Sequence, residues 1–180
     1  ASLGREAFFC ELNPLLQLLI EAKTVALDLS ADQREAIVER LLELADSFDA
    51  RIVSSRPDAE LQIAYERTFG NSLFFDTKVY ENVLRARTAI DVLACESPLA
   101  ANFLTVAVLA SLIPASRLIR RGDVRFKTES EIERTKKINF SDLVKSQLCL
   151  MERDMKLLQP LRQSPKFVCE DSRRLQHLLP

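Results

Sequence analysis

Two acidic residues in this chain stand where a carboxylate could bind a nucleoside. Glu11 directly follows a short apolar run, residues 7–10, which is long enough for one buried strand. Asp171 stands just beyond a second apolar run, residues 167–169. Ligands of open α/β sheets bind outside the carboxyl ends of the strands, where a carboxylate can accept hydrogen bonds from both hydroxyls of a ribose. We therefore expect Glu11 to be a ribose-binding carboxylate and Asp171 to open on the same edge.

A strong helix start follows Glu11. Asn13 is a preferred N-cap residue, and Pro14 suits the first helical position because that position needs no amide donor. The pattern predicts a strand, an acidic residue and a capped helix that continues to about Thr24. Structural alternatives stay open at this point, since Glu11 can simply favour the helix dipole and Asp171 can cap the turn that follows it.

Residues 11–14 (Glu-Leu-Asn-Pro) resemble the second motif of S-adenosylmethionine-dependent DNA methyltransferases of the restriction–modification type. In that family an acidic-x-Asn-Pro segment commonly follows the Gly-rich cofactor loop, and the Leu-rich helix here ends in Glu-Ala-Lys-Thr at residues 21–24. Residues 166–175 resemble the family's third motif, a strand followed by an acidic residue near the cofactor's adenine. The family more often has Gly where Glu170 stands, so this sequence departs from the pattern at that turn.

The resemblance implies a fold, a cofactor and a reaction. The fold is α/β, as part of a Rossmann-like methyltransferase sheet that carries a large, mainly helical insertion. The cofactor is S-adenosylmethionine, with Glu11, Asn13 and Asp171 contributing to its binding site. The reaction is methyl transfer to a DNA base, at an exocyclic amino group.

Two parts that the family needs for catalysis are absent from this sequence. Its three glycines, Gly4, Gly70 and Gly122, are far apart, which excludes a Gly-rich cofactor loop. The sequence also has no Pro-Pro-aromatic tetrapeptide and no Pro-Cys pair. By resemblance, the loop belongs before Ala1 and the tetrapeptide after Pro180, in flanking sequence or in a partner chain. We therefore assign no catalytic residue and expect no methyl transfer from this chain alone.

A cationic stretch at residues 117–127 is the candidate DNA-binding site. Five cations surround Gly122, which permits a tight turn: Arg117, Arg120, Arg121, Arg125 and Lys127. The formal net charge of the chain is −1, so any attraction to nucleic acid has to be local. Because arginine forks suit phosphate and guanine, we predict that these five residues contact DNA. A solvated, ion-paired turn is the alternative.

The remaining sequence features are typical of a cytoplasmic protein without a metal site. Four cysteines form no Cys-x-x-Cys pair and are expected to be reduced: Cys10, Cys95, Cys149 and Cys169. The start of the sequence has no signal-peptide pattern. Residues 99–113, which follow a Ser-Pro helix start, are apolar on nearly every side. This segment is too short for a bilayer, so we predict a buried helix and no contact with membranes.

The strand positions define the expected domains. We predict a methyltransferase core at residues 1–29 and 161–180, with a helical insertion at residues 30–160. The insertion should begin with a capping box at Ser30, and Asp76 should cap a later helix. Because a few strands cannot form a stable sheet alone, the remaining strands would come from flanking sequence or a partner chain. The alternative from another class is a non-catalytic helical interaction or regulatory module.

Overall fold

The computed structural model describes residues 8–70, 72–135, 139–157, 165–171 and 173. The chain forms two compact units. The terminal unit comprises Ala1–Glu39 and Glu152–Pro180, and the central unit comprises Arg40–Met151. The predicted insertion, residues 30–160, is therefore longer than the central unit at both ends.

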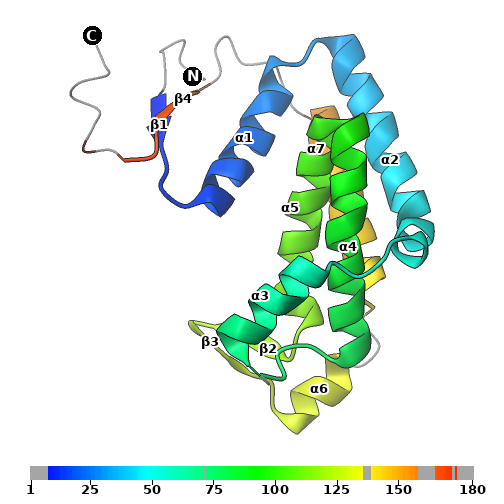
Figure 1. The fold of residues 1–180 in the computed structure, drawn as a ribbon. Helices are drawn as coiled ribbons and strands as arrows, with labels where there is room; N and C mark the ends of the chain where they lie inside the picture. Colours follow the sequence, from blue (N-terminus) through cyan, green and yellow to red (C-terminus); the bar gives the residue numbers. More distant parts are fainter. Residues whose placement is uncertain (1–7, 71, 136–138, 158–164, 172, 174–180) are drawn as a thin grey trace. The chain divides into compact units, whose positions relative to one another are not determined.

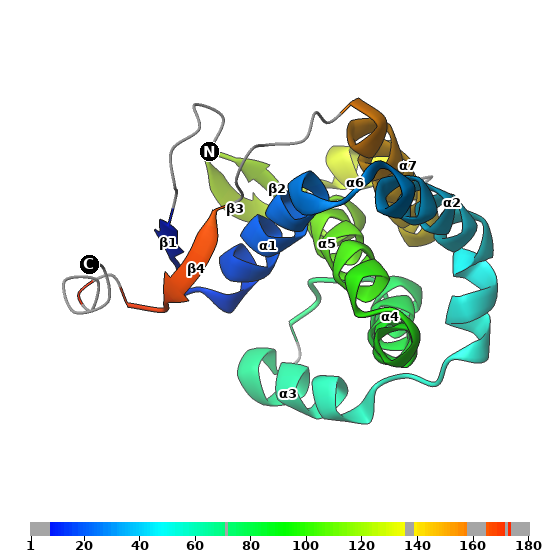
Figure 2. The same ribbon diagram turned by 90° about the horizontal axis from the view of Figure 1, so that it is seen from above.

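Helices dominate the described residues (Figures 1 and 2). In this part of the chain the elements follow one another as β1 (Phe8–Cys10), α1 (Pro14–Asp28), α2 (Ala31–Ser54), α3 (Ala59–Phe69), α4 (Thr77–Glu96), α5 (Pro98–Ala115), β2 (Leu118–Arg121), β3 (Asp123–Phe126), α6 (Glu129–Thr135), α7 (Phe140–Leu157) and β4 (Lys166–Cys169).

The predicted α/β fold, with part of a Rossmann-like sheet, is wrong. Within the described residues, the strands are three or four residues long and form two separate two-stranded sheets, β1 with β4 and β2 with β3. A Rossmann-like sheet needs several parallel strands with helices on both faces. The apolar runs before Glu11 and Asp171 do form strands, but the segment between them supplies helices and one hairpin, so the fold is mainly helical.

The two strands of the terminal unit lie side by side and are parallel (Figure 1). Phe9 pairs with Phe167, and their ring centroids are 5.5 Å apart. Cys10 pairs with Cys169, with 3.2 Å between the two sulfur atoms. Because the strands are parallel, their carboxyl ends leave the pair at the same edge.

The predicted helix start at Asn13 is confirmed. The side-chain oxygen of Asn13 accepts a hydrogen bond from the amide of Leu15 at 2.9 Å, and Pro14 is the first helical residue. α1 continues to Asp28, beyond the predicted end near Thr24. No Gly or Pro stands between these last two residues, so no residue there ends the helix.

The capping box at Ser30 is also confirmed, because the amide of Ser30 donates to the side chain of Gln33 at 3.0 Å and the amide of Gln33 donates to the hydroxyl of Ser30 at 3.2 Å. Ser97 caps α5. The prediction for Asp76 is partly wrong. α4 begins directly after Asp76, but this carboxylate makes no capping hydrogen bond.

Side chains of α2, α4, α5 and α7 build the core of the central unit. Figures 1 and 2 both show α4 and α5 side by side. Leu93 of α4 and Leu104 of α5 are fully buried. Phe48 of α2 and Phe140 of α7 are fully buried as well, with ring centroids 6.3 Å apart. Burial of each such side chain stabilises the fold by about 1.5–3 kcal/mol.

α5 is the apolar helix that the sequence predicted to be buried. It has these buried residues: Ala100, Ala101, Phe103, Leu104, Ala107, Val108 and Ser111. Of the helices in the described part of the chain, α5 alone is long and apolar enough to cross a membrane, judged by length and composition. The core helix of a soluble protein meets the same criterion.

The cationic stretch forms a β-hairpin, although the sequence predicted only a tight turn. β2 and β3 are antiparallel, with Leu118 opposite Phe126 and Arg121 opposite Asp123. Gly122 joins them with a φ of 80°, which glycine adopts without a side-chain clash. The alternation of charged and apolar residues in Asp-Val-Arg-Phe was the available strand signal.

Oxidised glutathione should join Cys10 to Cys169, because the paired strands hold these sulfur atoms in contact. The two thiols lose two protons and two electrons, which convert the glutathione disulfide to two reduced glutathione molecules. The hydrogen bond with Cys10 raises the pKa of Cys169, so the reaction should be faster at a pH of about 9 than at about 7.

Mass spectrometry of unreduced peptides measures this cross-link. The exposed residues Cys95 and Cys149 are internal controls that should gain only glutathione. Glutathione adducts on Cys10 and Cys169 without a peptide that joins them would contradict the strand pairing.

Candidate functional site

Glu11 and Asp171 leave the same edge of the terminal unit's strand pair. Glu11 follows β1 directly, and Asp171 lies two residues beyond the end of β4. One oxygen of Glu11, Oε1, accepts a hydrogen bond from the amide of Asn13 at 2.8 Å. The other oxygen, Oε2, accepts no hydrogen bond from a described residue. This oxygen can therefore accept a hydrogen bond from a ligand.

Asp171 forms a close ion pair with Arg173. The guanidinium atoms Nε and Nη2 lie 2.9 Å and 2.7 Å from Oδ2 of Asp171. The amide of Arg173 also donates to Oδ1, at 3.0 Å. Hydrogen bonding to the carboxylate raises the pKa of Arg173. A ligand amino group would have to compete with Arg173 for this carboxylate.

Asn13 has its side-chain oxygen committed to the start of α1. In this structure Asn13 is the N-cap of α1, two residues after Glu11, and its amide donates to the Glu11 carboxylate. Asn13 thereby helps to fix the position of Glu11. The edge thus offers one accessible acceptor at Glu11 and one ion-paired carboxylate at Asp171. Such a site can bind and orient hydroxyl or amino groups. The cofactor roles of Glu11, Asn13 and Asp171 stay predictions.

The five predicted DNA-binding cations do not share one face of the hairpin. Residues that oppose each other in an antiparallel pair project to the same side. Arg121 faces Asp123 across the pair and Arg125 occupies the same side of the hairpin. Arg120, opposite Val124, projects to the other side.

Glu131 of α6 binds the arginines on one side of the hairpin. The guanidinium of Arg125 donates to both carboxylate oxygens of Glu131, each at 2.9 Å. Arg121 lies farther away, with its Nη2 3.7 Å from Oε1 of Glu131. The amide of Thr128 also donates to Glu131, at 2.9 Å. Hydrogen bonds from Arg125 and then from Thr128 lower the pKa of Glu131 from 4.5 to about 2.

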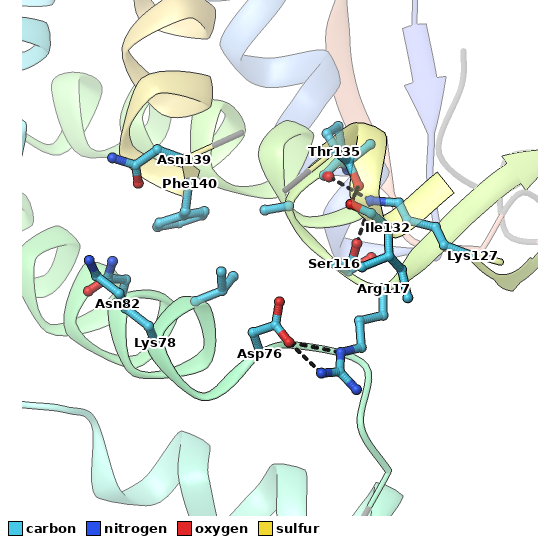
Figure 3. Close-up of a pocket in the computed structure, with 13 residues that line it drawn as sticks. Asp76, Lys78, Asn82, Ser116, Arg117, Lys127, Ile132, Thr135, Asn139 and Phe140 are labelled. Carbon is cyan, nitrogen blue, oxygen red and sulfur yellow. Dashed lines mark hydrogen bonds and ion pairs between the residues drawn. The ribbon is translucent and has the colours of Figure 1, made fainter. Parts of the chain in front are cut away.

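Asp76 and Lys127 anchor the base of the hairpin (Figure 3). Nε and Nη2 of Arg117 donate to Oδ1 of Asp76, at 2.9 Å and 2.6 Å. Lys127 Nζ donates to the main-chain oxygens of Pro114 and Ser116, at 3.1 Å and 2.6 Å. Burial lowers the pKa of Lys127. These groups line a pocket of about 390 Å³ between α4, the end of α5 and α6.

The hairpin cations therefore divide into two groups. Arg117, Arg125 and Lys127 are bound to carboxylates or main-chain oxygens of the central unit. Arg120 is exposed and forms no ion pair with a described residue, and the side chain of Arg121 is 68% exposed. Because the contact of Arg121 with Glu131 is long, at 3.7 Å, these two arginines are the members of the predicted set that could turn to a phosphate.

Asp76 and Glu131 are partners of the arginines that the sequence did not predict. Residues 128–131 read Thr-Glu-Ser-Glu, a capping-box pattern that could have predicted the contact of Glu131 with the amide of Thr128 but not its ion pair with Arg125. For Asp76 no local signal existed, since Arg117 lies far along the chain and reaches Asp76 only through the fold.

Acid should weaken the contact between α6 and the hairpin. The folded-state pKa of Glu131 is about 2, below the ordinary 4.5. A carboxylate with a lowered folded-state pKa contributes stability that is complete above the unfolded-state pKa and is lost as the pH falls through the folded-state pKa. The stability difference between the wild type and Glu131→Gln should therefore be constant near neutral pH and shrink as the pH falls from about 4.5 to about 2.

Urea unfolding at a series of pH values measures this difference. Glu129→Gln is the matched control, because Glu129 is exposed in the first turn of the same helix and forms no ion pair with a described residue. A difference for Glu131→Gln that did not depend on pH would show that the ion pair with Arg125 does not form.

No protein-family model, curated protein or solved structure matches this chain. Among the residues that the structure describes, no three His, Cys, Asp or Glu side chains come together as a metal site.

Proposed function

We propose that the chain contributes the nucleoside side of an S-adenosylmethionine site to a DNA methyltransferase of the restriction–modification type. The parallel pairing of β1 with β4 is the observation that carries this proposal. It brings the two segments that resemble the family's second and third motifs to one edge, although 159 positions separate Cys10 from Cys169. Because the pair is parallel, the acidic residue that follows each strand lies at the same edge.

The chemistry assigned to this edge is binding and orientation. Glu11 Oε2 would accept a hydrogen bond from a ribose hydroxyl, and Asp171 would exchange part of its contact with Arg173 for the adenine amino group. S-adenosylmethionine supplies an activated methyl group, and the transfer depends mainly on positioning. The Gly-rich loop and the catalytic tetrapeptide would come from flanking sequence or a partner chain.

The central unit would contribute to DNA binding in this proposal. Arg120 and Arg121 lie next to the tip of the hairpin and are exposed, so each can reach a backbone phosphate. The target base would have to leave the stack before it could react, because its acceptor atom cannot be reached inside the duplex. A non-catalytic interaction module is the second candidate, and it is favoured by the separate buried core of the central unit.

Loss of the Glu11 carboxylate should reduce binding of S-adenosylmethionine. A hydrogen bond to a charged group contributes about 1.5–3 kcal/mol, so Glu11→Ala should lower the affinity about tenfold or more. Photochemical labelling of the chain with radioactive S-adenosylmethionine, with S-adenosylhomocysteine as competitor, measures this change. Asp171→Asn should lower labelling as well, whereas Glu170→Gln, at an exposed neighbour that the proposal does not use, is the matched control.

Methyl transfer to mixed-sequence DNA by the purified chain should stay at background. Equal labelling of the wild type and Glu11→Ala would contradict the cofactor site and leave the interaction module as the better account. Turnover by the chain alone would contradict the assignment of catalysis to other sequence.

Substitution of the two exposed arginines should change DNA binding in a salt-dependent way. Each phosphate contact contributes about −0.9 to the slope of log affinity against log salt, so Arg120→Ala and Arg121→Ala should each flatten the slope by about one unit. Fluorescence anisotropy with a labelled duplex between about 50 and 200 mM salt gives these slopes. Arg56→Ala, at an exposed arginine outside the hairpin, is the control. An unchanged slope in the double variant would contradict the DNA contact and would favour the alternative, in which the hairpin is solvated and ion-paired.

A further inference from the structure

The pocket beside the base of the hairpin carries more positive than negative charge (Figure 3). Its volume, about 390 Å³, falls in the range of about 300–1,000 Å³ that is usual for small-molecule sites. Polar and apolar atoms both form much of its accessible surface. The charged side chains among the described residues of the lining are Asp76, Lys78, Arg117 and Lys127.

The carboxylate of this pocket is already neutralised. Both side-chain hydrogen bonds of Arg117 end on Oδ1 of Asp76, at 2.9 Å and 2.6 Å. Lys78 is exposed and forms no ion pair with a described residue. Lys127 likewise contacts no carboxylate of the described part of the chain. The pocket therefore retains the positive charge of two lysines.

Lys127 carries the ammonium that an anionic ligand would contact. Its Nζ donates to the main-chain oxygens of Pro114 and Ser116, and an ammonium has three hydrogens, so one hydrogen remains for a ligand. The Lys127 side chain is half-buried. Burial lowers its pKa more than the negative charges of Asp76 and Glu131 raise it. An anion bound to Nζ would compensate for the hydration that this ammonium has lost.

Apolar side chains form the rest of the pocket. Val79 of α4 and Ile132 of α6 are half-buried, and Phe140 at the start of α7 is buried. Figure 3 shows Phe140 on one side of the pocket and Lys127 on the other. A small inorganic anion at Lys127 would leave this apolar surface in contact with water. An organic anion would cover it and gain the free energy of apolar burial.

We infer that this pocket binds a small organic carboxylate, with one carboxylate oxygen on Lys127 Nζ and the apolar body against Val79 and Ile132. The positive charge of Lys78 adds to the attraction. A backbone phosphate of DNA fits the pocket less well, because it brings no apolar body to this surface. The inference goes beyond the proposed function, since the pocket shares no residue with the strand edge and includes neither Arg120 nor Arg121.

The experiment compares 2-naphthoate with 2-naphthamide, which have nearly the same size and shape but differ in charge. In NMR titrations of the isotope-labelled chain, both probes should shift the methyl signals of Val79, Ala115 and Ile132, which line the pocket. Only the carboxylate forms a charge-assisted hydrogen bond with Lys127, so it should bind about 10-fold more tightly than the amide. Inorganic phosphate should bind more weakly than 2-naphthoate.

Substitution of the lysines tests which charge carries the preference. Lys127→Gln keeps a donor for the main-chain oxygens but removes the charge, so the affinity for 2-naphthoate should fall about 10-fold while that for 2-naphthamide stays unchanged. Lys78→Gln should weaken 2-naphthoate about 2- to 5-fold, because Lys78 is exposed. Lys23→Gln, the same change at an exposed lysine of α1, is the matched control and should leave both affinities unchanged.

Several results would overturn the inference: equal affinity of the wild type for the two naphthalene probes, unchanged signals of the lining methyl groups, or phosphate binding as tight as that of 2-naphthoate. Equal weakening of both probes by Lys127→Gln would assign Lys127 a purely structural role and overturn it too. Comparison of the free-protein spectra shows whether Lys127→Gln is folded. If it is not, the preference of the wild type and the effect of Lys78→Gln decide the question.

Discussion

The parallel pairing of β1 with β4 is the contact on which the functional interpretation depends. It joins residues that are 159 positions apart, so it can form only when the intervening chain brings its ends back together. The central unit provides this return, since Phe48 of α2 packs against Phe140 of α7 and Lys145 of α7 pairs with Asp49 of α2. The closure entropy of so long a loop is therefore offset by a buried helical core.

Ion pairing inside the central unit determines which of the five hairpin cations would be available to DNA in the proposed function. A net charge of −1 leaves no general attraction, so a nucleic-acid site needs free local charge. Asp76 and Glu131 use Arg117 and Arg125 to fix the hairpin against α4 and α6. In the most basic stretch of the sequence, several cations are therefore bound by groups of the protein itself. The exposed pair Arg120 and Arg121 is what remains for a phosphate.

Local sequence patterns predicted the helix starts correctly, but they did not predict contacts between residues far apart in the sequence. Asn13, Ser30 and Ser97 cap helices with partners two or three residues away, so the chain itself contains the whole interaction. Asp76 looked like another cap, but its carboxylate binds Arg117, a partner that only the fold supplies. The Rossmann-like sheet was wrong for a related reason, because a resemblance over two short motifs does not supply the strands that a sheet requires.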